Sequence, residues 1–408
     1  MAIKLVDIDL STPLQPIYVD ARYSEVAALV RWGYVPLGTT WLRCSSASHT
    51  IGVAQLEGEI LQEVGWHLWQ HAVAGTLEAP DASDDRSLPP ISVVVCTRDR
   101  PLSLARCLDH LAHLDYPAYE VVVVDNCSRD ASVVQIVARS GFRYVREDTP
   151  GLDWARNRGI KEAAYDIVAF IDDDALASPG WLRGVARGFA DPAVSAVTGM
   201  VLPAELETAA QCEFERYGGM NKGFAGKTVR REELSDDELF WASAWGVGTN
   251  MAFRRALFEA VGDFDVALDV GTPTNGGGDV EFFHRTVAAG FALRYEPAAM
   301  VRHVHRRDTA ALRRQIYNNG RSFAAYLLTI ARNRPPGRAA VLRFALRHWV
   351  WGWLLRRLIA GLARRDRQAL RLALAELVGC CSAPRAYRKS RAVQSGARNR
   401  ALREIRGA

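Results

Sequence analysis

The feature that most constrains the fold is a series of short apolar stretches, rich in β-branched residues, that alternates with helical patterns after residue 90. Strands that are apolar on both faces and alternate with helices are typical of a parallel sheet covered on both sides. We therefore predict an α/β domain with an open, mostly parallel sheet. The predicted strands are Ile91–Cys96, Tyr119–Asp125, Phe142–Glu147, Asp166–Asp172 and Val194–Met200, and the predicted helices are Leu104–Leu114, Asp130–Ser140 and Leu152–Ala164.

Polar residues follow several of these strands directly. Thr97 and Arg98 end the first, Asp125 ends the second and Asp172 ends the fourth. Ligands of open α/β sheets bind at the carboxyl ends of the strands, so we expect these side chains to border one crevice. Asp125 is a candidate acceptor for a ribose or base edge, and a helix cap is the alternative.

Three consecutive aspartates, Asp172, Asp173 and Asp174, come directly after the fourth strand. Neighbouring carboxylates repel one another and are costly to hold near a core. A divalent cation would neutralise them, and Mg²⁺ is commonly held by one or two carboxylates plus substrate phosphates. Asp172 and Asp174 have the spacing of a D-x-D pair. An acidic surface turn is the alternative interpretation.

Two further segments carry candidate site residues. In GLDWARNRG, Arg156 and Arg158 lie at the start of a helix and could contact a diphosphate, unless they are simply solvated. In NGGGDVEFFHR, residues 275–285, a glycine loop runs into a helix. Asp279 lies at that helix start, where the helix dipole favours a carboxylate, either as a cap or as a reactive group.

Two histidines follow in HVHRR. If this segment is a strand, His303 and His305 lie on one face of it. One of them is a candidate metal ligand, and a structural role is the alternative.

Composition and charge narrow the class of protein. Of 408 residues, 49% are hydrophobic and 24% charged, as in globular proteins. Seven cysteines without a C-x-x-C pair favour a reducing compartment over a disulfide framework or zinc site, and the N-terminus has no apolar secretory signal. Residues 306–408 hold 24 Lys and Arg against 4 Asp and Glu, whereas the rest of the chain is acidic. This basic tail predicts a polyanionic partner: a lipid surface, nucleic acid or the acidic body itself.

We divide the chain into an N-terminal accessory region (1–80), a polar, Pro-rich linker (81–90), the α/β domain (91–307) and a basic helical region (308–408). The accessory region is predicted to contain helices near Arg22–Trp32 and Ala54–Ala74. In the basic region, no run reaches the ~18–20 apolar residues that a membrane span needs. Arg347, Arg356 and Arg357 interrupt the best candidate, RFALRHWVWGWLLRRLIAGLARR. It is predicted either to lie in a membrane interface or to pack on the α/β domain.

Residues from Ile91 to about Arg307, half of the chain, resemble the family 2 glycosyltransferases, which have the GT-A fold. The resemblance implies an inverting enzyme that moves a sugar from a nucleotide-diphosphate sugar to a hydroxyl, with Mg²⁺ or Mn²⁺. The matching stretches are ISVVVCTRDRP, VVVVDNCSRD, GLDWARNRGI, AFIDDDA, GVGTNMAFRRALFEAVGDFD and GGGDVEFFHRTVAAG.

Carried over to this sequence, the resemblance implies that Asp125 binds the nucleotide base and that Thr97 and Arg98 line the same pocket. Asp172 and Asp174 form the D-x-D, with Asp174 the direct metal ligand. Beside the resemblance, we also predict that Arg156 and Asp173 bind the nucleotide sugar and that His305 is a metal ligand.

Asp279 is implied as the catalytic base. The family often has Glu-Asp there, whereas Gly278 precedes Asp279 in this chain. Glu281 is therefore a rival base, placed further into the helix.

Two other functions would each explain part of the sequence. A sugar nucleotidyltransferase of related fold would carry a glycine-rich phosphate loop after the first strand, and CTRDRPLS has no glycine. A nucleic-acid-binding protein would explain the Arg-rich tail but not the acidic crevice, and no recognisable nucleic-acid-binding motif is present.

We therefore expect no nucleic-acid partner. The expected partners are a nucleotide-sugar donor, an acceptor with a hydroxyl group (a lipid-linked glycan, another glycan or a small molecule) and an anionic membrane surface. The expected place is the cytoplasm, at the inner face of a membrane, in cell-envelope or polysaccharide synthesis.

Overall fold

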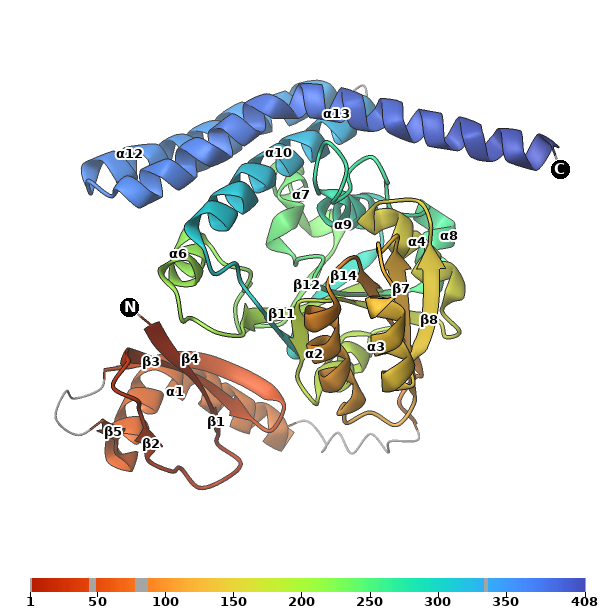
Figure 1. The fold of residues 1–408 in the computed structure, drawn as a ribbon. Coiled ribbons are helices and arrows are strands. Elements are labelled where there is room, and N and C mark those ends of the chain that lie inside the picture. The colour runs from red at the N-terminus through yellow and green to blue at the C-terminus, as the bar shows by residue number, and fades with distance from the viewer. Residues whose placement is uncertain (1, 44–48, 78–86, 334–336, 408) are drawn as a thin grey trace.

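A computed structural model describes residues 2–43, 49–77, 87–333 and 337–407. Figure 1 shows three parts: a small N-terminal unit, a central α/β domain, and a layer of C-terminal helices on the side of the domain opposite that unit. The predicted linker falls mostly on residues 78–86, which lie outside the described residues.

The N-terminal unit is a three-stranded sheet in the order β1-β3-β4, with helix α1 packed against β4. The predicted helix near Ala54–Ala74 is confirmed by α1 (Val53–Leu77). The predicted helix at Arg22–Trp32 is wrong, because Tyr23–Trp32 forms the central strand β3. The elements are β1 (Ala2–Asp9), β2 (Ile17–Tyr18), β3, β4 (Val35–Arg43), β5 (Thr50–Ile51) and α1.

The central domain contains a nine-stranded sheet, with the order β10-β14-β11-β13-β9-β6-β7-β8 and β12 paired to β14. β9, β6, β7 and β8 are parallel neighbours, as predicted. β13 runs antiparallel to both β9 and β11, so the sheet is mixed and mostly parallel. Its strands are β6 (Ile91–Thr97), β7 (Tyr119–Asn126), β8 (Arg143–Glu147), β9 (Ile167–Asp172), β10 (Ala175–Ala177), β11 (Val194–Pro203), β12 (Lys227–Val229), β13 (Asn250–Arg254) and β14 (Ala292–His303).

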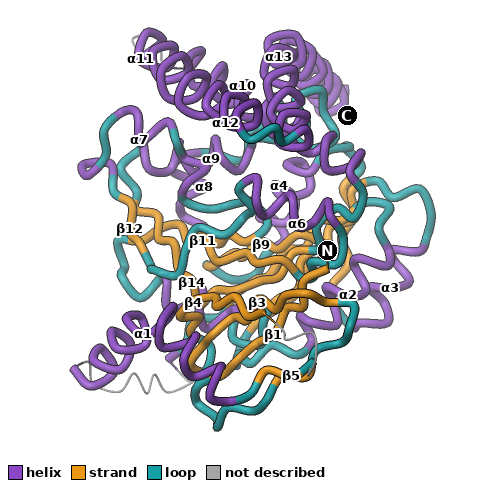
Figure 2. Tube along the Cα trace, turned by 90° about the vertical axis from the view of Figure 1, so that its left-hand side faces the viewer, coloured by secondary structure: helices purple, strands orange, loops and turns teal. Residues whose placement is uncertain are grey.

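Helices cover both faces of this sheet (Figure 2). Buried residues of α2, α3 and α5 pack on one face, and those of α4, α8 and α9 pack on the other. Successive apolar residues of each strand point alternately into one core and the other. Because both faces of the strands are buried, their sequences are continuous apolar runs. The helices are α2 (Pro101–Ala112), α3 (Ser132–Ser140), α4 (Leu152–Glu162), α5 (Trp181–Gly188), α6 (Ala209–Tyr217), η2 (Arg231–Glu233), α7 (Asp236–Phe240), η3 (Ala242–Ala244), α8 (Arg255–Val261) and α9 (Gly278–Ala288).

The C-terminal region is helical, as predicted, and packs on the domain. Trp349 and Leu354 are buried in the same core as α4 and α9. Ion pairs from His348 to Asp237 (2.9 Å) and from Arg391 to Asp265 (2.6 Å) join it to acidic residues of the domain. The helices are α10 (Thr309–Asn333), α11 (Arg338–Phe344), the π-helix η5 (Ala345–Leu355), α12 (Arg356–Ala363) and α13 (Arg367–Gly407).

Within the part of the chain that the structure describes, no helix combines the length and the apolar character that crossing a bilayer requires. α10 and α13 pack along one another so closely that a Cβ on Gly320 would lie 2.2 Å from the carbonyl oxygen of Glu376. The helices therefore form a tightly packed layer over the carboxyl edge of the sheet.

Candidate active site

The register of the parallel strands brings the predicted donor-site residues together. Thr97 pairs with Asp125 across β6 and β7, and Cys96 pairs with Asp172 across β6 and β9. Thr97, Asp125 and Asp172 therefore lie at one edge of the sheet. Arg98 is exposed beside them.

Asp125 is buried, and its two oxygens are both engaged. Oδ1 accepts a hydrogen bond from the Ser128 backbone N–H (2.9 Å), and Oδ2 accepts from the Tyr144 hydroxyl (2.8 Å) and Arg146 (3.2 Å). These contacts fix the carboxylate at the strand end. Tyr144 and Arg146 belong to β8 and were not among the predicted site residues.

Asp173 and Asp174 are held by one guanidinium. Arg100 donates to Asp173 Oδ1 at 2.6 Å and lies 3.0 Å from Asp174 Oδ2. Asp173 also accepts from the Thr97 hydroxyl at 2.7 Å. Burial raises the pKa of Asp173 to about 6, although Arg100 opposes that rise.

Asp174 has the opposite shift. Burial opposes its ionisation, but His303 (3.2 Å), Arg100 and Arg306 (3.7 Å) together hold its pKa well below the usual range. Its side chain is only 7% exposed. The negative charge of Asp174 is therefore already compensated by the guanidinium groups of Arg100 and Arg306.

Asp172 has a more open setting. One oxygen accepts a hydrogen bond from the Thr249 hydroxyl (2.7 Å), and Arg156 lies 3.8 Å from the other. The side chain is 30% exposed and lines the large cavity described below. Of the three aspartates, Asp172 alone borders that cavity.

The two predicted histidines contact each other through their Nδ1 atoms, 2.9 Å apart. His303 then reaches Asp174, and His305 Nε2 lies 2.8 Å from Glu215. Among the described residues no three His, Cys, Asp or Glu side chains form a group that could hold a metal ion, so the predicted set Asp172, Asp174 and His305 is not assembled in this structure.

Arg156 is buried behind Asp172. It donates to Asp153 at 2.9 Å and approaches the Gly248 carbonyl oxygen. Burial raises the pKa of Asp153 to about 7 against the effect of Arg156, and burial together with Asp153 raises the pKa of Asp269 well above its usual value. Arg158, by contrast, is exposed and pairs with Glu162 at 2.8 Å.

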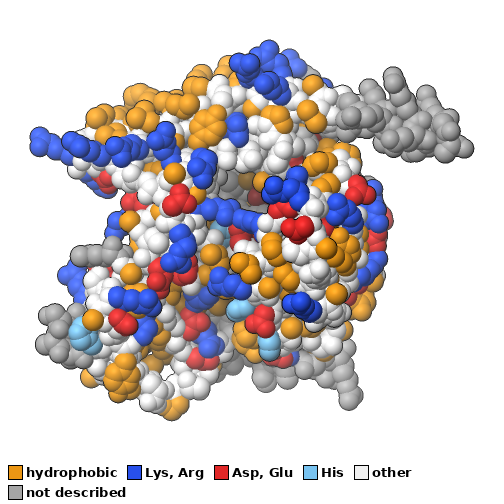
Figure 3. All heavy atoms as spheres, in the orientation of Figure 1, with side chains coloured by type: hydrophobic (Ala, Val, Ile, Leu, Met, Phe, Trp, Pro, Cys, Tyr) orange, Lys and Arg blue, Asp and Glu red, His pale blue; other side chains and the backbone are white. Residues whose placement is uncertain are grey.

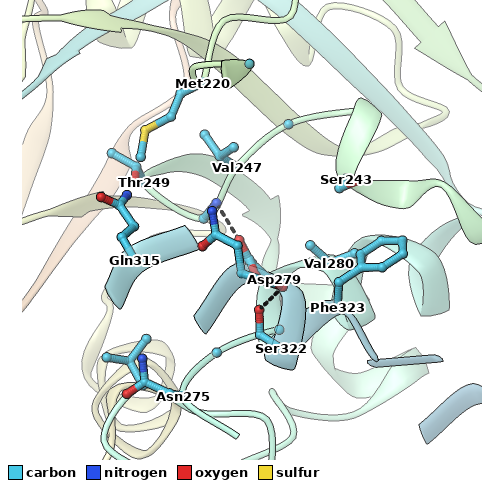
Figure 4. A pocket seen from close by; sticks show the side chains of 18 of the residues that line it. Met220, Ser243, Val247, Thr249, Asn275, Asp279, Val280, Gln315, Ser322 and Phe323 are labelled. Carbon is cyan, nitrogen blue, oxygen red and sulfur yellow. Dashed lines mark hydrogen bonds between the residues drawn. The ribbon is translucent and has the colours of Figure 1, made fainter. Parts of the chain in front are cut away.

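Asp279 occupies the second position of α9 and lines the cavity, near the centre of the view in Figure 4. The Gly248 backbone N–H donates to its Oδ2 at 2.8 Å. A Cβ on Gly278 would lie 2.0 Å from Asp153 Oδ2, so glycine before Asp279 allows the loop to approach α4. The rival Glu281 does not line the cavity and pairs with Arg285 at 2.9 Å.

The cavity has a volume of about 720 Å³ and lies between the carboxyl edge of the sheet and the C-terminal helices. Asp172, Arg156 and Asp279 line its inner part. The other residues that line the cavity were not among the predicted site residues. They include Lys222, Trp241 and Thr249 from the domain, and Gln315, Phe323, Trp349, Trp353 and Glu376 from the C-terminal helices.

Comparison with known proteins identifies the domain. Residues 92–262 match the sequence profile of glycosyl transferase family 2. This chain contains a domain of that family. Together with the mixed, mostly parallel sheet, the match confirms the predicted GT-A fold. Asp279 and the C-terminal wall of the cavity lie beyond the matched residues of the family 2 domain.

The family 2 domain has relatives of known name. A pre-mycofactocin glycosyltransferase of Mycobacterium tuberculosis is 25% identical over 61% of this chain and 50% of its own length. The GalNAc(5)-diNAcBac-PP-undecaprenol beta-1,3-glucosyltransferase of Campylobacter jejuni is 25% identical over 42% of this chain and 54% of its own length. The chain thus spans about half the length of these relatives. A solved mannosyltransferase of Pyrobaculum calidifontis, in complex with GDP-Man and Mn²⁺, is 20% identical, with a TM-score of 0.46 over 78% of this chain and 82% of its own.

Proposed function

We propose that this protein is an inverting glycosyltransferase, which moves a sugar from a nucleotide-diphosphate sugar to an acceptor hydroxyl. The observation that carries the proposal is the presence of Asp172 and Asp279 in one cavity at the carboxyl edge of a family 2 domain. Asp172 comes from the end of β9, and Asp279 comes from the start of α9. One carboxylate thus faces the donor and the other faces the acceptor.

The donor nucleotide would bind over β6 and β7, outside the large cavity. Asp125 would accept a hydrogen bond from the base, with Thr97 beside it and the exposed Arg98 free to reach a phosphate. Asp125 is fixed by Ser128, Tyr144 and Arg146. Binding of the nucleotide would therefore cost little conformational entropy at this side chain.

Asp279 would act as the base. The Gly248 N–H donates to its Oδ2, and the side chain lies in the first turn of α9. Within the described part of the chain, its Oδ1 has no hydrogen-bond partner and is therefore able to take the proton of an acceptor hydroxyl. The acceptor oxygen then attacks C1 of the donor sugar as the bond to the diphosphate breaks, which inverts the configuration at C1.

The family implies a bound divalent cation, and the carboxylates of this structure fit such a cation in part. Asp172 is partly exposed and faces the cavity, as a ligand shared with substrate phosphates must be. Asp174 is held by Arg100, Arg306 and His303. Mg²⁺ or Mn²⁺ held by Asp172 and the donor phosphates would stabilise charge on the departing diphosphate. Asp174 would join that set only if Arg100 moved.

A donor screen tests the proposed function. The full chain is incubated with a panel of nucleotide sugars and Mn²⁺, and release of nucleotide diphosphate is measured with and without EDTA. We expect one donor to give cation-dependent release. Release of pyrophosphate from sugar phosphate and nucleoside triphosphate, without nucleotide diphosphate from any donor, would instead support the nucleotidyltransferase alternative.

We also propose that the outer face of α11, η5 and α12 contacts an anionic membrane from the cytoplasmic side. Residues 338–365 contain seven Arg and no acidic residue. Figure 3 shows hydrophobic side chains along the upper edge of the molecule, where the C-terminal helices run, together with Lys and Arg. Exposed apolar groups among cations suit a lipid interface. The exposed apolar residues are Leu342, Leu346, Trp351, Ile359 and Leu362.

A further inference from the structure

The cavity has a side formed largely by aromatic rings, which we call the aromatic wall: Trp241, Phe323, Trp349 and Trp353. The rings contact one another. The centroids of Trp241 and Phe323 lie 5.5 Å apart, those of Trp241 and Trp353 lie 5.8 Å apart, and those of Phe323 and Trp349 lie 5.0 Å apart. The wall is therefore one continuous surface, built from the domain, α10 and η5.

A polar cluster, whose members Tyr217 and Glu376 also line the cavity, holds Trp353 in place. Trp353 Nε1 donates to Glu376 Oε1 at 3.1 Å, and the Tyr217 hydroxyl donates to Oε2 at 2.5 Å. The Arg357 guanidinium lies 3.8 Å from the Trp353 ring centroid and 4.0 Å from that of Tyr217. The orientation of Trp353 is thus fixed before any ligand binds, which lowers the entropy cost of binding against it.

Three of the four rings of the wall differ from ordinary core, whereas Trp349 is buried. Phe344 packs behind Trp241 and is 1% exposed, whereas Trp241, Phe323 and Trp353 remain partly exposed to the cavity. Aromatic surface left in contact with water lacks the stabilisation that burial would give. A ligand group that covers these rings recovers it.

The side of the cavity near Asp279 is different in character. Figure 4 shows Gln315 and Thr249 on one side of Asp279, and Phe323 with Val280 on the other. Polar side chains thus border the cavity on one side of Asp279, and apolar side chains that include a ring of the aromatic wall border it on the other. Asp125 and Thr97 do not line it, so the wall is separate from the predicted nucleotide site.

We infer that the acceptor carries a flat apolar group, such as an aromatic ring, next to the hydroxyl that receives the sugar. The hydroxyl lies at Asp279, and the apolar group lies against Trp241, Phe323 and Trp353. This inference rests on the proposed function, because it takes Asp279 as the group that faces the acceptor. It assigns acceptor specificity to helices outside the matched family 2 segment.

Binding of matched glycosides tests the inference without turnover. Phenyl and methyl β-D-glucosides, and the corresponding galactosides and α-D-mannosides, are titrated into the full chain by calorimetry. We expect at least one phenyl glycoside to bind about tenfold more tightly than its methyl partner, since burying one ring on aromatic side chains is worth about that factor.

Two variants locate the effect. Trp353→Leu should reduce the phenyl preference to about threefold or less, and Phe323→Leu should do the same if Trp353→Leu does not fold. Trp351→Leu is the matched control, because Trp351 lies on the same helix but is 60% exposed and does not line the cavity. It should keep the full preference. Circular dichroism and a thermal melt check the fold of each variant.

The outcomes separate the two proposals. Equal binding of phenyl and methyl glycosides overturns the inference, whether or not a donor is turned over. Equal binding that weakens in Trp353→Leu also overturns it, because the wall would then stack on the acceptor sugar itself. A phenyl preference that survives both variants overturns it as well. A phenyl preference that disappears in Trp353→Leu, without donor turnover, supports this binding site and counts against the proposed function.

Discussion

Asp172 and Asp174 are two residues apart, yet their carboxylates have different surroundings. Asp172 is partly exposed to the cavity, whereas Asp174 is enclosed by Arg100, His303 and Arg306. The D-x-D spacing could be predicted from the sequence. The partners of Asp174 could not, because Arg100 follows β6 and His303 ends β14, and only the fold brings them to β9.

Asp172→Asn should weaken donor binding in the presence of Mn²⁺ by about tenfold or more, because a cation ligand is lost. Asp174→Asn should instead lower thermal stability, because Arg100 and His303 lose a buried partner, a loss of up to about 3–5 kcal/mol. Calorimetry of donor nucleotide with and without Mn²⁺ measures the first effect. If Asp174→Asn removes the Mn²⁺ effect and Asp172→Asn keeps it, Asp174 is the ligand, as the family resemblance implied.

The buried carboxyls of Asp153 and Asp269 predict a pH dependence of stability. The pKa of Asp153 is raised to about 7 and that of Asp269 is raised well above its usual value, both chiefly by burial. A carboxyl whose pKa is higher in the folded state stays protonated in the folded protein at pH values where the same carboxyl in the unfolded chain has lost its proton. Stability should therefore fall as pH rises from about 4 to above 7.

Asp269→Asn removes one of these titrations without changing the size of the side chain. We expect its Tm to exceed that of the unsubstituted protein by several degrees at pH 8, and the difference to shrink at pH 5. Melting curves across this range measure it. An Asp269→Asn variant with a constant Tm difference at every pH would show that the carboxyl does not titrate there.

At the scale of elements, the parallel strands and their helices were the most predictable part. Val93, Val123 and Ala169 lie on strands buried on both faces, and such runs have few alternatives. The segment from Arg22 to Trp32 was predicted wrongly as a helix. Val26 to Val30 are all buried as well, but EVAALV lacks strand alternation, so its pairing with β1 and β4 decided its structure. Gly33, which directly follows the segment at a positive φ in the turn to β4, is the sequence signal for this hairpin.

Helix η5 shows what the sequence could and could not predict. WVWGW was interpreted as a candidate for a membrane interface. Trp349 and Trp353 are four residues apart and line the cavity, whereas Trp351 is exposed. The spacing of these three tryptophans indicated that they lie on two different faces of the helix. That the inner face meets Trp241 and Phe323, from distant segments, follows only from tertiary packing.

The crossing of α10 and α13 makes a further prediction. A Cβ on Gly320 would meet the Glu376 backbone at 2.2 Å, so Gly320→Ala should push the helices apart, lower Tm and weaken binding at the aromatic wall. Gly58→Ala is the matched control, since Gly58 lies in helix α1 with open space around it. It should raise stability by up to about 1 kcal/mol. Gly320→Ala with unchanged Tm would show that the crossing is loose.

At the scale of the whole molecule, the acidic domain and the basic helices are joined by ion pairs and a shared core. The C-terminal region therefore has two tasks in this account. Its inner side lines the cavity in which we propose that the acceptor binds, and its outer side is proposed to contact lipid. The domain boundaries at residues 80, 90 and 307 remain predictions.

The full chain should float with vesicles containing anionic lipid at low salt and should be released at about 1 M salt, where the Debye length is about 3 Å. Replacing Trp351 and Ile359 by serine should reduce flotation, because both side chains are exposed on the outer face. Trp66→Ser, at an exposed position of α1 in the N-terminal unit, is the control and should float like the unsubstituted protein. Protein that stays at the bottom of the gradient at low salt would rule out the membrane proposal.

The central claim is that Asp279 removes the proton of the acceptor in a nucleotide-sugar-dependent transfer. It is tested most directly by measuring donor affinity and kcat for Asp279→Asn and Glu281→Gln with the donor and acceptor that the unsubstituted protein uses. Asp279→Asn should bind the donor normally and lose kcat by ~10²-fold or more, because the base contacts only the acceptor. Glu281→Gln should keep most of its activity, since Glu281 pairs with Arg285 outside the cavity. Full activity of Asp279→Asn, with that loss found in Glu281→Gln, would contradict the account.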